Sequence, residues 1–118
     1  MKAAVTGWGK YTPDNVMTNE ELSKFVDTSD EWIVQRTGVK ERRVCHVNNS
    51  DMASVAGLRA VASAGLDPKD IDCIILATCT PDTIVPSAGS FVQKKMGCTN
   101  ALVYDMNAAC AGFMYALE

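Results

Sequence analysis

Cys110 is the residue of this sequence with the clearest capacity for chemistry. It lies in "DMNAACAGFMYALE", between an apolar run that predicts a strand and a segment with apolar residues at helical spacing. At such a turn, backbone N–H groups and the helix dipole stabilise a thiolate, and an N–H can hold an oxyanion. Small neighbours leave room for an acyl chain. Cys110 is therefore a candidate acyl-accepting nucleophile, and the alternative is a small buried packing residue.

Trp32 and Arg36 form a second candidate site. Their i, i+4 spacing places them on one face of a short predicted helix. An indole and a guanidinium on one face can clamp a flat heteroaromatic ring between them, and Arg36 also favours phosphates. The alternative is an ordinary amphipathic helix with a half-buried tryptophan and a surface arginine.

The remaining thiols and the one histidine favour packing and loop roles. The chain has five cysteines, an odd number without CxxC spacing, which is typical of a reducing compartment. We interpret the other four as small buried residues: Cys45, Cys73, Cys79 and Cys98. His46 lies in the polar loop "CHVNNS" and is expected at the surface. With a single histidine, we expect no metal site.

Alternating strand and helix patterns position these residues. Strands are expected at 3–9 ("AAVTGWG"), 72–78 ("DCIILAT") and 101–106 ("ALVYDM"), with a short exposed one at 39–44. The continuous apolar run at 72–78 suits a strand covered on both faces of a parallel sheet. This order predicts an α/β domain with right-handed crossovers.

Helix boundaries follow from capping patterns. Thr18 with Glu21 and Thr28 with Glu31 each form a capping-box pattern. Glycines are placed to end three helices: Gly38, Gly65 and Gly97. The Ala-rich helix 51–64 has apolar residues on more than one face and is expected to be buried. Ser87 is expected to cap the helix that follows Pro86.

Composition limits the class of protein. With 118 residues, 47% hydrophobic and 21% charged, the chain fits one globular domain, and no linker suggests an internal boundary. A net charge of −3 and a pI near 5.1 do not favour nucleic acid or an anionic membrane as partner. No segment approaches the ~18 apolar residues of a membrane span, so a cytoplasmic location is expected.

Three segments together resemble a known family. "DMNAACAGFMYALE", "VDTSDEWIVQRTGVKERR" and "ILATCTPDTIVPS" are similar, in collinear order, to segments of β-ketoacyl-[acyl-carrier-protein] synthase III, the initiating condensing enzyme of type II fatty acid synthesis. The resemblance implies a thiolase-like fold of two αβαβα halves and a homodimer. Residues 1–118 would be the N-terminal half-domain, truncated within the helix after Cys110, so we expect a piece of a longer enzyme.

The resemblance also implies a reaction and a set of site residues. Cys110 would take an acyl group from acyl-CoA, and the carbanion from decarboxylated malonyl-acyl-carrier protein would attack that thioester. Thr28, Trp32 and Arg36 map onto positions that contact coenzyme A, which is a substrate here, with no cofactor expected. Val85 maps onto a position lining the acyl pocket across the dimer interface. The histidine and asparagine of the second stage come from the family's C-terminal half, so this chain alone is not expected to condense.

Two other functions stay open from the sequence. One is another condensing enzyme of the thiolase superfamily, making a quinolone, polyketide or hydroxymethylglutaryl thioester. The other is a non-catalytic interaction module built on this half-fold. A histidine and an asparagine in condensing-enzyme context in the full-length coding sequence would favour an enzyme.

Overall fold

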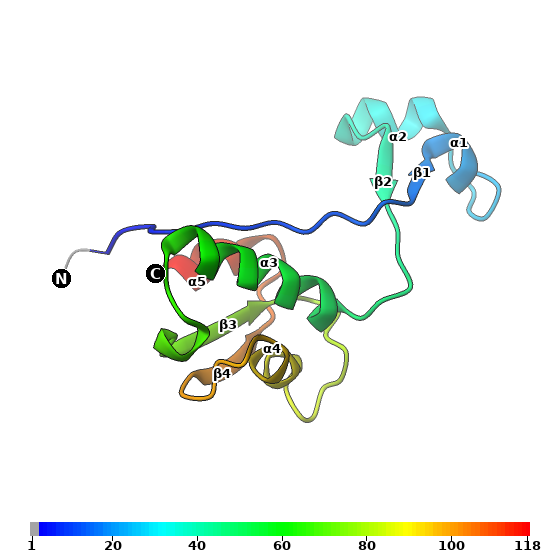
Figure 1. The fold of residues 1–118 in the computed structure, drawn as a ribbon. Coiled ribbons are helices and arrows are strands. Elements are labelled where there is room, and N and C mark those ends of the chain that lie inside the picture. The colour runs from blue at the N-terminus through cyan, green and yellow to red at the C-terminus, as the bar shows by residue number, and fades with distance from the viewer. Residues whose placement is uncertain (1–2) are drawn as a thin grey trace. The chain divides into compact units, whose positions relative to one another are not determined.

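The computed structural model describes residues 3–118, which form two compact units (Figure 1). The smaller unit is Thr12–His46. The larger one combines residues 3–11 with 47–118. The sequence carries no linker signal at this division, because the chain leaves the larger unit and returns to it through ordinary polar segments.

The smaller unit is a two-stranded antiparallel sheet with two short helices. Strand β1 (Val16–Thr18) pairs with β2 (Glu41–Arg43), with Met17 opposite Arg42. Helix α1 (Asn19–Leu22) begins at the predicted capping box, in which Glu21 N–H donates to Thr18 Oγ1 at 3.2 Å. Helix α2 (Asp30–Thr37) ends at Gly38, whose φ of 72° is the predicted left-handed cap.

The larger unit contains a parallel strand pair and three helices. Helix α3 (Asn49–Ala64) and a 3₁₀ turn (Pro68–Asp70) come first. Strand β3 (Cys73–Ala77) then pairs in parallel with β4 (Leu102–Met106), and the chain segment that connects the two strands contains α4 (Ala88–Met96). A 3₁₀ turn (Ala109–Ala111) leads into α5 (Gly112–Leu117). The predicted parallel pairing and the glycine ends of α3 and α4 are confirmed. No helix within residues 3–118 is long and apolar enough to cross a membrane.

An apolar core lies between α3, α4 and one face of the strand pair. Its buried members are Val61, Val92, Met96, Cys98 and Ala101, with Ile74 and Leu76 of β3 packed against them. On the other face of the strand pair, Leu102 is 66% and Tyr104 40% exposed. For the run 72–78, coverage on both faces is a wrong prediction in this chain, because Cys73 and Ala77 at the ends of β3 are exposed and residues 74–76 are only partly buried.

Three other predictions need correction. Residues 3–9 form no strand, because the described strands pair only β1 with β2 and β3 with β4. This segment instead packs against α3: a Cβ on Gly7 would lie 2.4 Å from Ala60 O.

Helix α2 is capped by Ser29, whose Oγ accepts from Trp32 N, and not by Thr28. Helix α3 is only partly buried, since Leu58 is 39% exposed.

Candidate active site

Cys110 lies where β4 passes into α5, as predicted. The carboxyl ends of both parallel strands meet at this edge, where Thr78 N–H extends the ladder by donating to Met106 O at 3.0 Å. Cys110 follows within the 3₁₀ turn Ala109–Ala111, and its side chain is exposed. In this chain, therefore, Cys110 is not a buried packing residue, and its thiol is open to a reagent.

The backbone around Cys110 is strained and tightly folded. Ala109 has φ 45°, a left-handed conformation that costs a residue with a Cβ about 1–3 kcal/mol. Ala111 N–H donates to Ala108 O at 3.0 Å, and Gly112 N–H donates to Ala109 O. These two N–H groups are used within the turn, which leaves the N–H of Cys110 as its candidate oxyanion donor.

The small residues around Cys110 have a packing reason as well as a chemical one. A Cβ on Gly112 would lie 3.2 Å from the Cβ of Ala77, at the end of β3. The start of α5 therefore approaches the strand closely because both positions are small. This contact sets where the turn, and with it Cys110, lies on the sheet edge.

Val85 lies in the loop between β3 and α4 and is 85% exposed, next to Ile84 at 90%. Both apolar side chains therefore lie open to solvent in this chain. The role expected for Val85, lining an acyl pocket across a dimer interface, stays a prediction.

Trp32 and Arg36 share one face of α2, but they are not an open clamp. The Arg36 guanidinium carbon lies 4.5 Å from the centroid of the Trp32 ring, in a cation–π contact. A flat ring between them would need about 7 Å, twice the contact distance of about 3.5 Å. The two groups stack directly on each other and leave no slot between them. A ligand ring could therefore stack only on the outer face of the indole or of the guanidinium.

Thr28 lies beside Trp32 in one surface hollow. This hollow has a volume of about 480 Å³ and is lined by Asp27, Thr28, Ser29 and Trp32. The structure thus brings Thr28 and Trp32 together at this hollow, and Arg36 stacks on the same indole without being one of the residues that line the hollow. Trp32 is 52% exposed, enough to offer a stacking surface.

Asn19 organises the smaller unit, and no pattern in the sequence indicated this role. Its side chain is 1% exposed; Nδ2 donates to Asp30 Oδ1 at 2.8 Å and to Val39 O at 2.7 Å. Arg42 donates to its Oδ1. The residue therefore ties the start of α2, the segment before β2 and β2 itself to the start of α1. Because its partners lie 11 to 23 residues away, no local pattern could reveal them.

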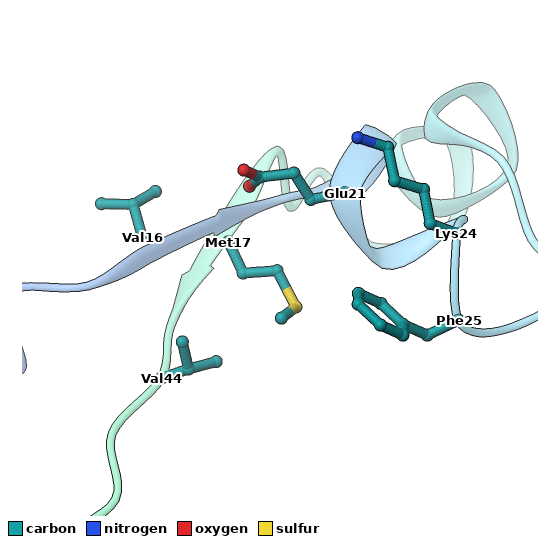
Figure 2. Close-up of a pocket in the computed structure, with 6 residues that line it drawn as sticks. All are labelled: Val16, Met17, Glu21, Lys24, Phe25 and Val44. Carbon is teal, nitrogen blue, oxygen red and sulfur yellow. The ribbon is translucent and has the colours of Figure 1, made fainter.

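A second hollow of the smaller unit is apolar at its base (Figure 2). Its volume is about 280 Å³, and it is lined by Val16, Met17, Glu21, Lys24, Phe25 and Val44. Figure 2 shows Met17 and Phe25 pointing toward one another, with the Lys24 ammonium turned away. Phe25 is 76% exposed, so this surface is apolar and open.

The other cysteines divide by exposure. Cys98 is fully buried, and burial, with Asp67 nearby, raises the pKa of its thiol, so the packing role predicted for it is confirmed. Cys73 and Cys79 are exposed, and their predicted burial was wrong. Cys73 begins β3 and Cys79 follows its end.

His46 is exposed in the loop after β2, as predicted. Within residues 3–118, no three His, Cys, Asp or Glu side chains are grouped to hold a metal ion.

Comparison with known proteins identifies the class. No protein-family model matches the sequence. The fold matches the crystal structure of 3-oxoacyl-[acyl-carrier-protein] synthase III from Aquifex aeolicus with a TM-score of 0.88 and 47% identity, over 95% of this chain and 37% of that one. It also matches the priming β-ketosynthase of the R1128 polyketide pathway, with a TM-score of 0.86 and 36% identity, over 96% and 34%. The fold is thiolase-like, that of the condensing enzymes.

Within that class the similarity is specific. The chain is 53% identical over 116 residues to β-ketoacyl-[acyl-carrier-protein] synthase III 2 of Vibrio vulnificus, covering 98% of this chain and 32% of the relative. It is thus homologous to β-ketoacyl-[acyl-carrier-protein] synthase III over nearly its whole length, which confirms the resemblance seen in its motifs. The chain spans about a third of the length of the curated relatives it matches.

Proposed function

We propose that the protein to which this chain contributes is the initiating condensing enzyme of type II fatty acid synthesis, with this chain as its N-terminal part. The observation that carries the proposal is the exposed Cys110 at the carboxyl edge of the parallel strands, in a chain 53% identical to named synthases. The enzyme would join acyl-CoA and malonyl-acyl-carrier protein. A cytoplasmic homodimer is part of the proposal.

The first stage uses residues of this chain. The Cys110 thiolate attacks the carbonyl carbon of acyl-CoA, and the negative charge moves to the oxygen, near the Cys110 N–H. Collapse of this intermediate expels the coenzyme A thiolate, which takes up the proton that Cys110 lost. Coenzyme A is bound as a substrate by Thr28, Trp32 and Arg36, with its ring on an outer face of the stacked pair and its phosphates near the guanidinium.

The second stage needs groups beyond this chain. Malonyl-acyl-carrier protein loses CO₂, and the resulting carbanion attacks the acyl-cysteine carbonyl, which releases the Cys110 thiolate and forms the β-ketoacyl product. The resemblance assigns the stabilisation of that carbanion to a histidine and an asparagine of the C-terminal half. His46 is exposed in a loop of the smaller unit and does not fill this role.

A direct test is acylation of the full-length protein. We expect incubation with acetyl-CoA to add one acetyl group, found by mass spectrometry on the peptide carrying Cys110. Cys110→Ser should abolish the adduct, while Cys79→Ser, which alters another exposed thiol after β3, should leave it intact. Acylation that persists in Cys110→Ser would contradict the assignment.

The similarity to a polyketide priming synthase supports a second candidate, a condensing enzyme that starts a polyketide. It predicts the same acyl-cysteine. Adding malonyl-acyl-carrier proteins from fatty acid and from polyketide synthesis to the acylated enzyme separates the two, because the true partner should yield product faster. No β-ketoacyl product with either carrier would favour a non-catalytic module.

A further inference from the structure

The start of α4 is held by a carboxylate from another element. Ser87 occupies the N-cap position, but its hydroxyl lies 3.1 Å from Ser90 Oγ and makes no cap bond to the backbone. Asp105 of β4 takes that role: Oδ2 accepts from Ala88 N at 2.6 Å and Oδ1 accepts from Gly89 N at 2.7 Å. Two short bonds to an ionised acceptor at a helix N-terminus are among the stronger hydrogen bonds in proteins.

The residues around this cap leave the first turn of α4 no room to move relative to Asp105. A Cβ on Gly89 would lie 3.0 Å from Asp105 Oδ1 and 2.7 Å from a methyl group of Val103, so the approach requires glycine. Ala88 is 0% exposed and cannot shift outward without opening the core. The carboxylate therefore fixes the first turn of α4 on β4.

The loop that precedes α4 is anchored at its other end as well. Asp82 Oδ1 accepts from Ser50 N at 3.0 Å, which holds the loop to the start of α3. Within the loop, Thr83 Oγ1 donates to Pro86 O at 2.8 Å. Between these points, Ile84 and Val85 are 90% and 85% exposed. The loop 82–87, which we call the arch, is thus fixed at both ends, and its middle presents two apolar side chains.

We propose that Asp105 is a positioning residue that sets which acyl groups the enzyme accepts. Asp105 lies on β4, the strand that leads into Cys110. It also holds the first turn of α4, and the arch that contains Val85 directly precedes this turn. In the homodimer, Asp105 thereby fixes on its own copy the loop that lines the acyl pocket of the partner copy. This inference rests on the proposed function, because the resemblance to the synthases that supports this function also implies the place of Val85 in the acyl pocket.

The test compares two carboxylates that cap a turn in the full-length protein. In Asp105→Asn, the amide nitrogen faces one of the two N–H groups and that bond is lost. Asp67→Asn is the matched control: Asp67 Oδ1 accepts from Lys69 N at 2.9 Å at the 3₁₀ turn 68–70, and it touches no part of the arch. For each variant, kcat/KM for acylation of Cys110 is measured with acetyl-CoA and with octanoyl-CoA.

We expect Asp105→Asn to change the ratio of the two kcat/KM values by about tenfold, the low end of what one methylene is worth in an apolar pocket. Asp67→Asn should leave the ratio unchanged. An unchanged ratio in Asp105→Asn, even with a lower melting temperature, would overturn the inference and leave Asp105 a structural cap. If Asp105→Asn fails to fold, Thr83→Val decides, since it loosens the arch without touching α4; an unchanged ratio there also overturns it.

The wild-type protein separates this inference from the function on which it rests. Wild-type enzyme that is not acylated at all would overturn the proposed function and the inference with it. Wild-type enzyme that is acylated, with the same ratio in Asp105→Asn, would overturn the inference alone.

Discussion

The two units of the chain are held together by different means. The larger unit has an apolar core between α3, α4 and β3, centred on Val92 and Met96. The smaller unit buries one apolar residue, Ile33, and is organised by the amide of Asn19. A unit of fewer than about 40 residues rarely buries enough apolar surface to fold by that means alone. The hydrogen bonds of the buried Asn19 amide give it a defined shape instead, and they make it sensitive to substitution of this residue.

Asn19→Ala should break the smaller unit and spare the larger one. It removes the hydrogen bonds to the Val39 carbonyl, the Asp30 carboxylate and the Arg42 guanidinium, each with a net contribution of about 0.5–1.5 kcal/mol or somewhat more for a charged partner. The two tryptophans report the units separately, Trp32 on the smaller and Trp8 on the larger. In single-tryptophan variants, we expect Trp32 fluorescence to shift at lower urea concentration and Trp8 fluorescence to be unchanged.

The control for this prediction is Asn100→Ala. Asn100 also makes an amide hydrogen bond, to Lys69 O at 3.1 Å, but it is exposed and lies in the larger unit. We expect it to change stability little. Equal effects of the two substitutions would mean that the buried amide is not what organises the smaller unit.

Trp32→Ala and Arg36→Ala test whether the smaller unit, and not the larger one, binds acyl-CoA. Each should weaken acyl-CoA binding to the full-length protein by about 1–2 kcal/mol, as expected for a partly desolvated cation–π contact. Because the two groups stack on each other, the double variant should lose less than the sum of the single losses. Isothermal titration with acyl-CoA measures all three. Trp8→Ala, which removes a 71% exposed indole from the other unit, should bind as the wild type does.

The smallest expected effect concerns the capping box of α1. Glu21 Oε2 accepts from Thr18 N at 2.8 Å, and this backbone hydrogen bond, followed by that of the Thr18 hydroxyl, lowers the pKa of Glu21 below its ordinary value of 4.5. A lowered pKa means a contribution to stability that is present above pH 4.5 and is lost as the pH falls through the folded-state value.

Hydrogen exchange of the α1 amides against pH measures that loss. Protection of these amides should decrease below pH 4.5 in the wild type. Glu21→Gln keeps an acceptor for Thr18 N–H but does not titrate there, so its protection should not follow the pH in this range. The same pH dependence in both proteins would assign the effect to another group.

What the sequence could reveal was local. The glycine caps at Gly38, Gly65 and Gly97 and the box at Thr18 were predicted because each signal lies within one helical turn. The strands β3 and β4 were predicted because a parallel strand is a continuous apolar run. Cys110 was found because small residues surround it at a strand end.

What the sequence missed depends on residues far apart. The strand expected at 3–9 has suitable residues but no pairing partner within the described chain. The Asp105 cap joins residues 16 and 17 positions apart, and nothing in "LVYDM" marks that aspartate as a helix cap. The Trp32–Arg36 spacing predicted a shared face, but not that the two groups would close on each other.

The close contact between the first segment of the chain and α3 also constrains the order in which the protein can fold. Lys10 O accepts from Arg59 across 49 residues, and Gly9 approaches so near that a Cβ there would lie 2.2 Å from Ala56 O. During synthesis the N-terminal segment emerges first, yet its docking surface does not exist until α3 has been made. In the smaller unit, Asn19 and its three hydrogen-bond partners all lie within residues 12–46, so these bonds can form before α3 has been made. The earliest residues of the chain therefore reach their place only after α3, although they are made before the whole smaller unit.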